Sequence, residues 1–289
     1  MANGIIIIDK PQGWTSMDVC AKLRGMFQEH RVDHAGTLDP MATGILPVFL
    51  GRATRAVTFA SESEKEYQFG LKLGVVTNTQ DVTGEIVRQT PFTGTAEDLL
   101  AVLPTFRGDI QQVPPMYSAI KINGQKLYDL ARKGREVERA PRPVTIHALE
   151  LEDQLGPDEF LLRVRCSKGT YVRTLCHDIG AALGCGGCMS SLRRTMAAGF
   201  TLADSVTLDA VLQADDPAAL LLPVDAYFSG YPDLVADPEQ EKRIRNGAAL
   251  PMPGLPDGRY RVYGQDGTFL ALSQGENGVL TTVKSFYEV

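Results

Sequence analysis

One acidic residue, Asp39, stands in a loop-forming stretch whose composition suits chemistry on a polar substrate. It lies in residues 34–44 (HAGTLDPMATG), where Gly36 and Gly44 give the backbone freedom on either side. Because a proline follows Asp39, the helical region is disfavoured and we expect an extended or turn conformation there. A lone Asp in such a loop is more often a turn former or helix cap. A chemical role for Asp39 therefore needs support from other segments.

Two other side chains are candidates, each with an ordinary structural alternative. Arg173 follows a Lys-Gly-Thr turn, so we expect it near a helix N-terminus, where an arginine often only forms a surface ion pair. Tyr67 begins an alternating strand, where a tyrosine is usually a core or rim aromatic. His34 could share the Asp39 loop or simply bond to the backbone.

The cysteines and the remaining motifs give no firm pointer to a metal or cofactor. Cys185 and Cys188 have the spacing of a zinc or dithiol pair. Zinc would need two more suitably spaced ligands, and a thioredoxin-like pair would open a helix, whereas this one follows a helix. The chain has no GxGxxG, GxxxxGK[ST], HExxH or GxSxG pattern. Because the chain contains serine, histidine and aspartate residues, composition alone does not exclude a Ser-His-Asp catalytic arrangement.

Length, composition and charge limit the number of domains and the classes of protein to which the chain could belong. With 289 residues, 44% of them hydrophobic, the chain can form one large domain, or a large domain with a small appendage. No apolar run approaches the roughly 18 residues of a membrane span. The lack of a signal peptide predicts reduced thiols and a cytoplasmic protein. A net charge of −6 argues against a general polyanion binder. Basic residues nevertheless gather between 121 and 142, either as a local nucleic-acid contact or as a solvated helix face.

The elements that must position these residues alternate between strands and helices. We expect a buried strand at 4–8, a helix capped by Thr15 or Ser16, and a half-buried strand at 67–73. Further along we expect a polar turn at 77–84, a short strand at 85–88, a helix capped by Thr95, a short helix at 127–133, a strand at 160–166, a helix from 171 that ends before Gly184, and short strands beyond 230. This order predicts a mixed α/β, or α+β, architecture.

Seven segments, in one order, carry a family resemblance. They are residues 9–16 (DKPQGWTS), 34–44, 65–74 (KEYQFGLKLG), 77–84 (TNTQDVTG), 115–119 (PMYSA), 167–174 (SKGTYVRT) and 192–194 (LRR). Together they resemble the bacterial tRNA pseudouridine-55 synthases of the TruB family, closely over residues 4–195 and more weakly beyond. Asn78 departs from some relatives, which carry Asp there, whereas the functional Asp of the family matches Asp81.

The resemblance implies an α+β fold in two parts. Residues 1–230 would form the pseudouridine synthase catalytic domain, with a central mixed or antiparallel sheet, flanking helices and a basic RNA-gripping insertion at about 114–143. Residues 231–289 would form a small, β-rich, PUA-like RNA-binding module.

The resemblance also implies an activity: isomerisation of uridine-55 in the tRNA T-loop to pseudouridine, with the target base flipped out. Asp39 would be the catalytic nucleophile or base, Tyr67 would stack on the detached uracil, and Arg173 would partner the carboxylate. The implied substrate-binding residues are Lys10, Pro11, His34, Gly36, Thr37, Asp81, Lys121, Lys126, Arg132, Tyr171, Leu192 and Arg193. Candidate phosphate contacts are Lys10, Arg31, Arg52, Arg55, Lys121, Lys126, Arg132, Lys133, Arg193 and Arg194.

The expected partner is the tRNA T-arm, with no cofactor, no metal, no membrane and no obligatory protein partner, so the chain is expected to be a monomer. Two other functions stay open. One is a tRNA-folding chaperone activity, alone or in addition to catalysis. The other is a guide-RNA-dependent relative, although the basic extensions usual in such proteins are not visible.

Overall fold

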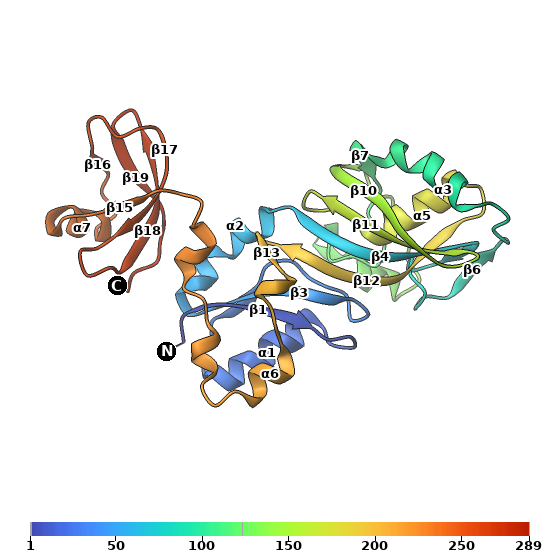
Figure 1. Cartoon of the computed structure of the whole chain (residues 1–289), viewed down its shortest axis with the longest axis horizontal. Helices are drawn as coiled ribbons and strands as arrows, with labels where there is room; N and C mark the ends of the chain where they lie inside the picture. The colour runs from blue at the N-terminus through green and yellow to red at the C-terminus, as the bar shows by residue number, and fades with distance from the viewer. Residues whose placement is uncertain (1, 123, 289) are drawn as a thin grey trace.

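A computed structural model describes residues 2–122 and 124–288, and its strands form two separate large sheets (Figure 1). The larger sheet has ten strands. Its main path runs β14 (Val206–Thr207), β1 (Gly4–Lys10), β3 (Thr43–Leu50), β12 (Gly187–Ala197), β4 (Lys65–Leu73), β11 (Glu159–Cys166), β10 (Arg142–Gly156) and β7 (Gly108–Gln112), with β2 (Val32–His34) on β3 and β13 (Phe200–Thr201) on β12. Most pairs are antiparallel, but β1–β14 and β3–β12 are parallel. The prediction of a central mixed or antiparallel sheet is therefore confirmed, and the sheet is a mixed one.

Helices and short 3₁₀ turns pack against this sheet and connect it to the five-stranded C-terminal sheet. The α-helices are α1 (Ser16–Phe27), α2 (Val57–Glu62), α3 (Ala96–Val102), α4 (Leu127–Ala131), α5 (Val172–Ala182), α6 (Leu208–Gln213) and α7 (Pro238–Arg245). The short 3₁₀ turns are η1 (Gly51–Ala56), η2 (Leu103–Phe106), η3 (Leu202–Asp204), η4 (Pro217–Leu220) and η5 (Val224–Phe228). None of the helices in the described part of the chain is long and apolar enough to span a bilayer.

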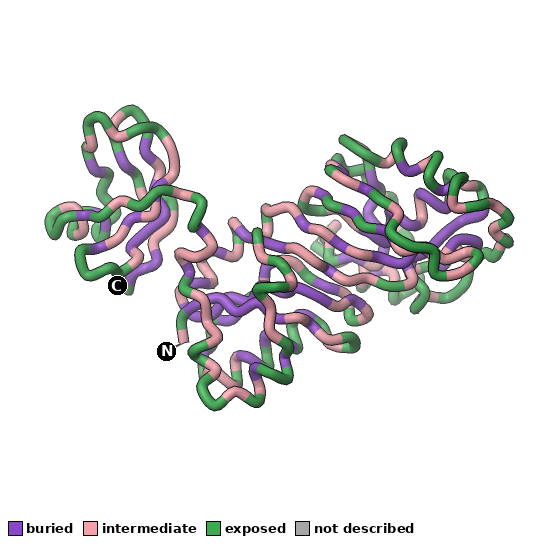
Figure 2. The backbone as a smooth tube through the Cα atoms, viewed as in Figure 1, coloured by how far each residue is buried: buried purple, intermediate pink, exposed green. Residues whose placement is uncertain are grey.

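Buried residues follow the strands of the main sheet (Figure 2), and their side chains form separate clusters. One cluster joins β4 and β11 to α5 and α3 through residues such as Phe69, Phe160 and Ile179. Another packs α1 and α6 against β1 and β3. The start of α1 is fixed locally by a capping box, in which Thr15 and Asp18 bond to each other's backbone N–H groups. These clusters make a rigid base for the loops at the junction of β3, β4 and β12.

Two hairpins extend from the part of the chain that forms the larger sheet. The first hairpin pairs β5 (Val75–Thr77) with β6 (Ile86–Gln89). The polar segment predicted as a turn lies between these two strands. The basic insertion forms β8 (Lys121–Ile122), β9 (Gln125–Lys126) and α4, around its own small core of Met116, Leu127 and Leu130. We call residues 114–143 the arm.

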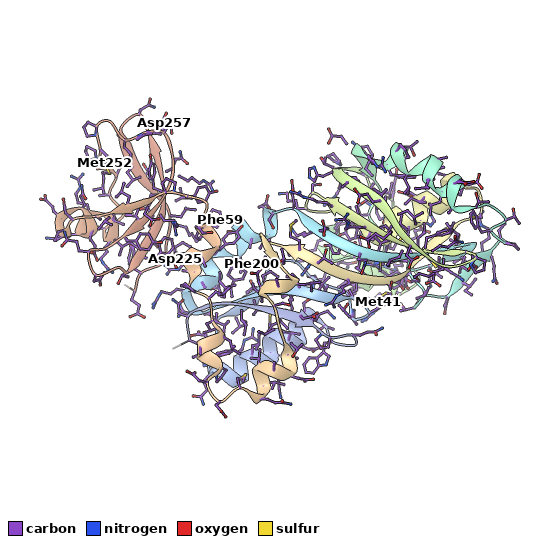
Figure 3. All side chains as sticks on the ribbon, viewed as in Figure 1. Met41, Phe59, Phe200, Asp225, Met252 and Asp257 are labelled. Carbon is purple, nitrogen blue, oxygen red and sulfur yellow. The ribbon has the colours of Figure 1, made fainter. Side chains whose placement is uncertain are left out.

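The C-terminal sheet has the order β15 (Asp233–Val235), β17 (Gly258–Tyr263), β18 (Phe269–Glu276), β19 (Val279–Ser285) and β16 (Leu250–Pro251). It has its own core with α7, yet aromatic residues link it to the larger part. Phe228 of η5 packs against both Phe59 and Phe286, and the labelled Phe59 and Phe200 mark this junction (Figure 3).

Candidate active site

The Asp39 loop is held from beneath by the first motif of the chain. The Ser16 hydroxyl accepts a hydrogen bond from the Leu38 N–H at 2.9 Å, and the Gly13 N–H donates to the Pro40 carbonyl at 2.7 Å. The Ala42 N–H closes the turn on the Asp39 carbonyl at 3.0 Å. The segment before α1 thus fixes the backbone on both sides of Asp39, while the Asp39 side chain remains 39% exposed.

Gly44 allows β3 to lie against β12 directly after this loop. Its φ is +98°, and a Cβ there would lie 2.2 Å from the Arg194 carbonyl oxygen. Only glycine fits both this backbone conformation and this close approach. The parallel pairing of Thr43 and Gly44 with Arg193 and Arg194 therefore depends on it.

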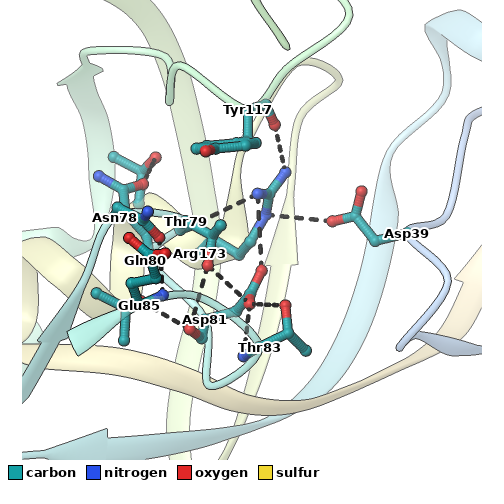
Figure 4. Close-up of polar contacts among 11 residues, drawn as sticks. Asp39, Asn78, Thr79, Gln80, Asp81, Thr83, Glu85, Tyr117 and Arg173 are labelled. Atoms are coloured by element: carbon teal, nitrogen blue, oxygen red, sulfur yellow. Dashed lines mark hydrogen bonds and ion pairs between the residues drawn. The ribbon is translucent and has the colours of Figure 1, made fainter. Parts of the chain in front are cut away.

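Arg173 reaches Asp39 from the first turn of α5 (Figure 4). Its Nε lies 3.1 Å from Oδ2 of Asp39, and its Nη groups donate to the carbonyls of Thr79 at 3.2 Å and Tyr117 at 2.8 Å. The Arg173 side chain is only 9% exposed. One guanidinium thereby joins the Asp39 loop, the β5–β6 turn and the arm.

The helix that carries Arg173 is aligned by a buried glutamine. Gln112 accepts a hydrogen bond from the Tyr171 N–H at 2.9 Å, and its amide donates to the Tyr171 carbonyl at 3.2 Å. Because Tyr171 is the N-cap of α5, this reciprocal pair sets where the helix begins. Burial raises the pKa of the half-buried Tyr171 phenol, so it stays a neutral hydroxyl beside the site.

Asp81 lies on the other side of the same guanidinium, with Oδ2 3.7 Å from Nη1 of Arg173. Its Oδ1 accepts from the Thr83 N–H at 2.9 Å and from the hydroxyls of Thr79 and Thr83. The Asp81 side chain is 7% exposed and fully engaged. Its place in the turn therefore makes it a support for Arg173.

Tyr67 forms the apolar wall of the site together with Leu192. Tyr67 is 8% exposed and belongs to the same cluster as Leu38 and Ala42 of the Asp39 loop. Leu192 packs against that cluster from β12, one strand away. Burial raises the pKa of Tyr67, so the ring is neutral and apolar. The structure thus brings together a carboxylate, a guanidinium and an aromatic ring from distant parts of the sequence.

Comparisons with known proteins place this arrangement in a family. The family model described as "TruB family pseudouridylate synthase (N terminal domain)" matches residues 24–172, and "tRNA pseudouridylate synthase B C-terminal domain" matches residues 173–229. The chain belongs to the TruB family. Pseudouridylate synthases are isomerases, so the chain belongs to a family of enzymes.

Relatives match this TruB-family chain over nearly its whole length. The tRNA pseudouridine synthase B of Clostridium kluyveri is 40% identical, covering 98% of this chain and 99% of the relative. That of Azoarcus sp. is 44% identical, covering 97% and 93%. Among solved structures, a Cbf5–Nop10–Gar1 complex matches with a TM-score of 0.75 at 24% identity, over 99% of this chain and 85% of the other. That likeness shows the fold.

Several predicted binding residues of the TruB-family chain surround the Asp39 loop. Pro11 is half-buried, Gly36 adopts a φ of +89°, and Thr37 is exposed. His34 is half-buried in β2, and burial lowers its pKa, which favours the neutral imidazole. Arg193 is 37% exposed and pairs with Asp9 at 2.8 Å.

Two of the predicted phosphate contacts require correction. Lys10 is fully buried, and its amino group donates to the Pro11 and Trp14 carbonyls. Arg194 is 1% exposed and also binds backbone carbonyls. Both side chains act inside the protein because buried carbonyls, not phosphates, accept their hydrogen bonds. Arg55 is half-buried and one of its Nη groups donates to the Ser285 carbonyl of the C-terminal sheet, so its phosphate contact stays a prediction.

The predicted basic residues of the arm share one face. Lys121, Lys126 and Arg132 line a pocket together with Gly124, Gln125, Asp129 and Lys133. Lys126 and Arg132 both lie over the Tyr128 ring, at 5.4 Å and 5.5 Å from its centre. These residues lie on the arm and do not join the Asp39 cluster directly.

The Cys185–Cys188 segment packs a helix against a strand. A Cβ on Gly180 of α5 would lie 2.1 Å from the Gly187 nitrogen, so glycine permits the close contact. All five cysteines are free and buried. In residues 2–122 and 124–288, no three His, Cys, Asp or Glu side chains gather as a metal-binding group.

Sequence reasoning missed two residues that build the site. Gln112 is buried and aligns α5, but a single glutamine at the end of a short strand gives no local signal. Arg194 is expected at the RNA surface because arginines are usually exposed, but in the structure it is buried and binds the Gly36 and Ile45 carbonyls.

Proposed function

We propose that this TruB-family chain isomerises uridine-55 in the T-loop of tRNA to pseudouridine, with Asp39 as the essential carboxylate. The bond from N1 of uracil to C1′ of the ribose breaks, and a bond from C5 to C1′ forms. The C5 proton is lost and N1 gains one, so the reaction needs no net oxidation or added group. The contact of Asp39 with Arg173 beside the Tyr67 ring is the observation that carries this proposal.

Asp39 acts on the sugar or the base, by covalent attack or by proton abstraction, and either route needs an ionised carboxylate. Arg173 orients that carboxylate through its planar guanidinium, which a lysine would hold less rigidly. Tyr67 stacks on the detached uracil while the base turns. Stacking of this kind is worth about 1–3 kcal/mol per base, which helps to retain the free uracil.

The target base must leave the folded T-loop before Asp39 can reach it. His34, in its neutral form, fills the space that the base vacates. The arm cations bind RNA phosphates, and the C-terminal sheet acts as a PUA-like RNA-binding module. Recognition then depends on the shape of the T-arm and its splayed bases. Because tRNA is the proposed substrate, the proposed place of action is the cytoplasm, and we propose that the enzyme works as a monomer without a protein partner.

The direct test uses purified protein, EDTA and an unmodified tRNA transcript, followed by mass-spectrometric mapping of pseudouridine. We expect one modified uridine, at position 55, and the same product with an isolated T-stem-loop. Product elsewhere would refute the assigned position. A requirement for an added guide RNA would favour the guide-dependent alternative.

A second activity, tRNA folding, is favoured by the separation of the arm cations from Asp39. If the arm alone grips RNA, Asp39→Asn will refold a misfolded tRNA as well as wild type does. A loss of refolding in Asp39→Asn would remove this second activity.

A further inference from the structure

Arg194 is a fully buried arginine directly beneath the Asp39 loop. It is 1% exposed, and no carboxylate pairs with it among the residues that the structure describes. A buried cation without a counter-charge carries a large desolvation penalty. An apolar side chain of similar length would fill the same space without that penalty. The arginine therefore needs another explanation than packing.

The contacts of its guanidinium supply that explanation. Nη2 donates to the Gly36 carbonyl at 3.0 Å, and Nε donates to the Ile45 carbonyl at 2.7 Å. Gly36 precedes Asp39 and Ile45 follows it, so one rigid group joins the two ends of the catalytic loop. A guanidinium presents several N–H groups in a fixed planar fork, which suits this span.

Arg194 also fixes the loop relative to the stacking residue. In the β12–β4 pair, Arg194 lies directly opposite Tyr67, and in the β12–β3 pair it lies opposite Gly44. The side chain thus extends from the strand next to Tyr67 into the base of the Asp39 loop. A shift of this guanidinium would change the separation between the carboxylate and the aromatic ring.

We propose that Arg194 is a positioning residue, which sets the Asp39 carboxylate against the Tyr67 ring without touching RNA. This inference rests on the proposed role of Asp39. We therefore expect that removing the Arg194 side chain slows the chemical step and leaves RNA binding intact. A misplacement of about 1 Å at a reacting group can cost roughly 100-fold in rate.

The test compares Arg194→Met and Arg194→Lys with wild type in single-turnover assays at saturating enzyme, alongside the Kd for a T-arm hairpin. We expect the Arg194→Met rate constant to fall roughly 100-fold, with Kd within about 3-fold of wild type. Arg194→Lys keeps the charge but has all of its donors on one nitrogen instead of a planar fork, so its rate constant should be intermediate. Arg107→Met is the control for removing a guanidinium that binds backbone, because Arg107 donates twice to the Leu149 carbonyl outside the site, although it is more exposed than Arg194.

Wild-type rate constants in folded Arg194→Met and Arg194→Lys would overturn the proposal. A rise in Kd that accounts for the whole loss would also overturn it, because Arg194 would then act on RNA binding. If Arg194→Met does not fold, Arg194→Lys decides on the same criteria. An active Asp39→Asn would instead refute the proposed function, so the two failures are distinguishable.

Discussion

Replacing Arg173 with methionine separates the stability of the site from its chemistry. The change removes an ion pair with Asp81, whose side chain is 7% exposed, and one with the more exposed Asp39. Breaking a buried pair typically costs about 3–5 kcal/mol, because it leaves an uncompensated charge. Three hydrogen bonds from Thr79 and Thr83 still stabilise Asp81. The solvated Asp39 pair adds at most about 1 kcal/mol. We therefore expect a loss of about 3 kcal/mol in unfolding free energy.

A double-mutant cycle with Asp81→Asn isolates the buried pair. In the double variant the unpaired charge at position 81 is gone, so part of the penalty disappears. The losses in unfolding free energy of the two single variants should therefore add up to about 1–2 kcal/mol more than the loss measured for the double variant. Urea unfolding at pH 7 measures this coupling. The double variant should stay inactive, because Asp39 still lacks its partner. Additive losses, or recovered activity in the double variant, would refute the role given to Arg173.

The remaining predictions concern the loop, the buried lysine and the arm. Gly44→Ala should unfold the β3–β12 contact or abolish turnover, measured by circular dichroism and product formation, and a stable, active variant would contradict the packing argument. Burial and the nearby Arg194 lower the pKa of Lys65 from 10.5 to about 8. The folded protein then loses this proton before the unfolded chain does, so unfolding free energy should rise by about 1 kcal/mol from pH 7 to 9. In denaturant titrations, Lys65→Met should lack this rise. If the unfolding free energy of Lys65→Met rises with pH as steeply as that of wild type, the role given to Lys65 is wrong. Lys126→Ala should weaken T-arm binding and reduce the slope of log Kd against log salt by about one, whereas an unchanged slope would remove Lys126 from the phosphate contacts.

The sequence predicts local features of this fold well. Thr15 caps α1 because Thr15 and Asp18 form a capping box within one turn. Gly184 follows the end of α5 with a φ of +78°, as its position after the apolar repeat predicts. Such features depend on neighbours along the chain, so their residue types are informative.

Tertiary features are less visible in the sequence. The long strand β12 (Gly187–Ala197) was not predicted, because its half-polar residues do not alternate clearly. From their residue types, Lys10 and Arg194 are predicted to be surface cations. Only the folded chain shows the backbone carbonyls that accept their hydrogen bonds. The meeting of Asp39 with Arg173 was expected from the family resemblance, since no local pattern links residues so far apart.

The central claim, that Asp39 carries the chemistry, is tested most directly by Asp39→Asn in a single-turnover assay on the T-arm hairpin. Asparagine keeps the size of the side chain but has no negative charge. We predict that Asp39→Asn binds the hairpin with nearly wild-type Kd and forms no pseudouridine. Pseudouridine formed by Asp39→Asn at a rate close to wild type would contradict it.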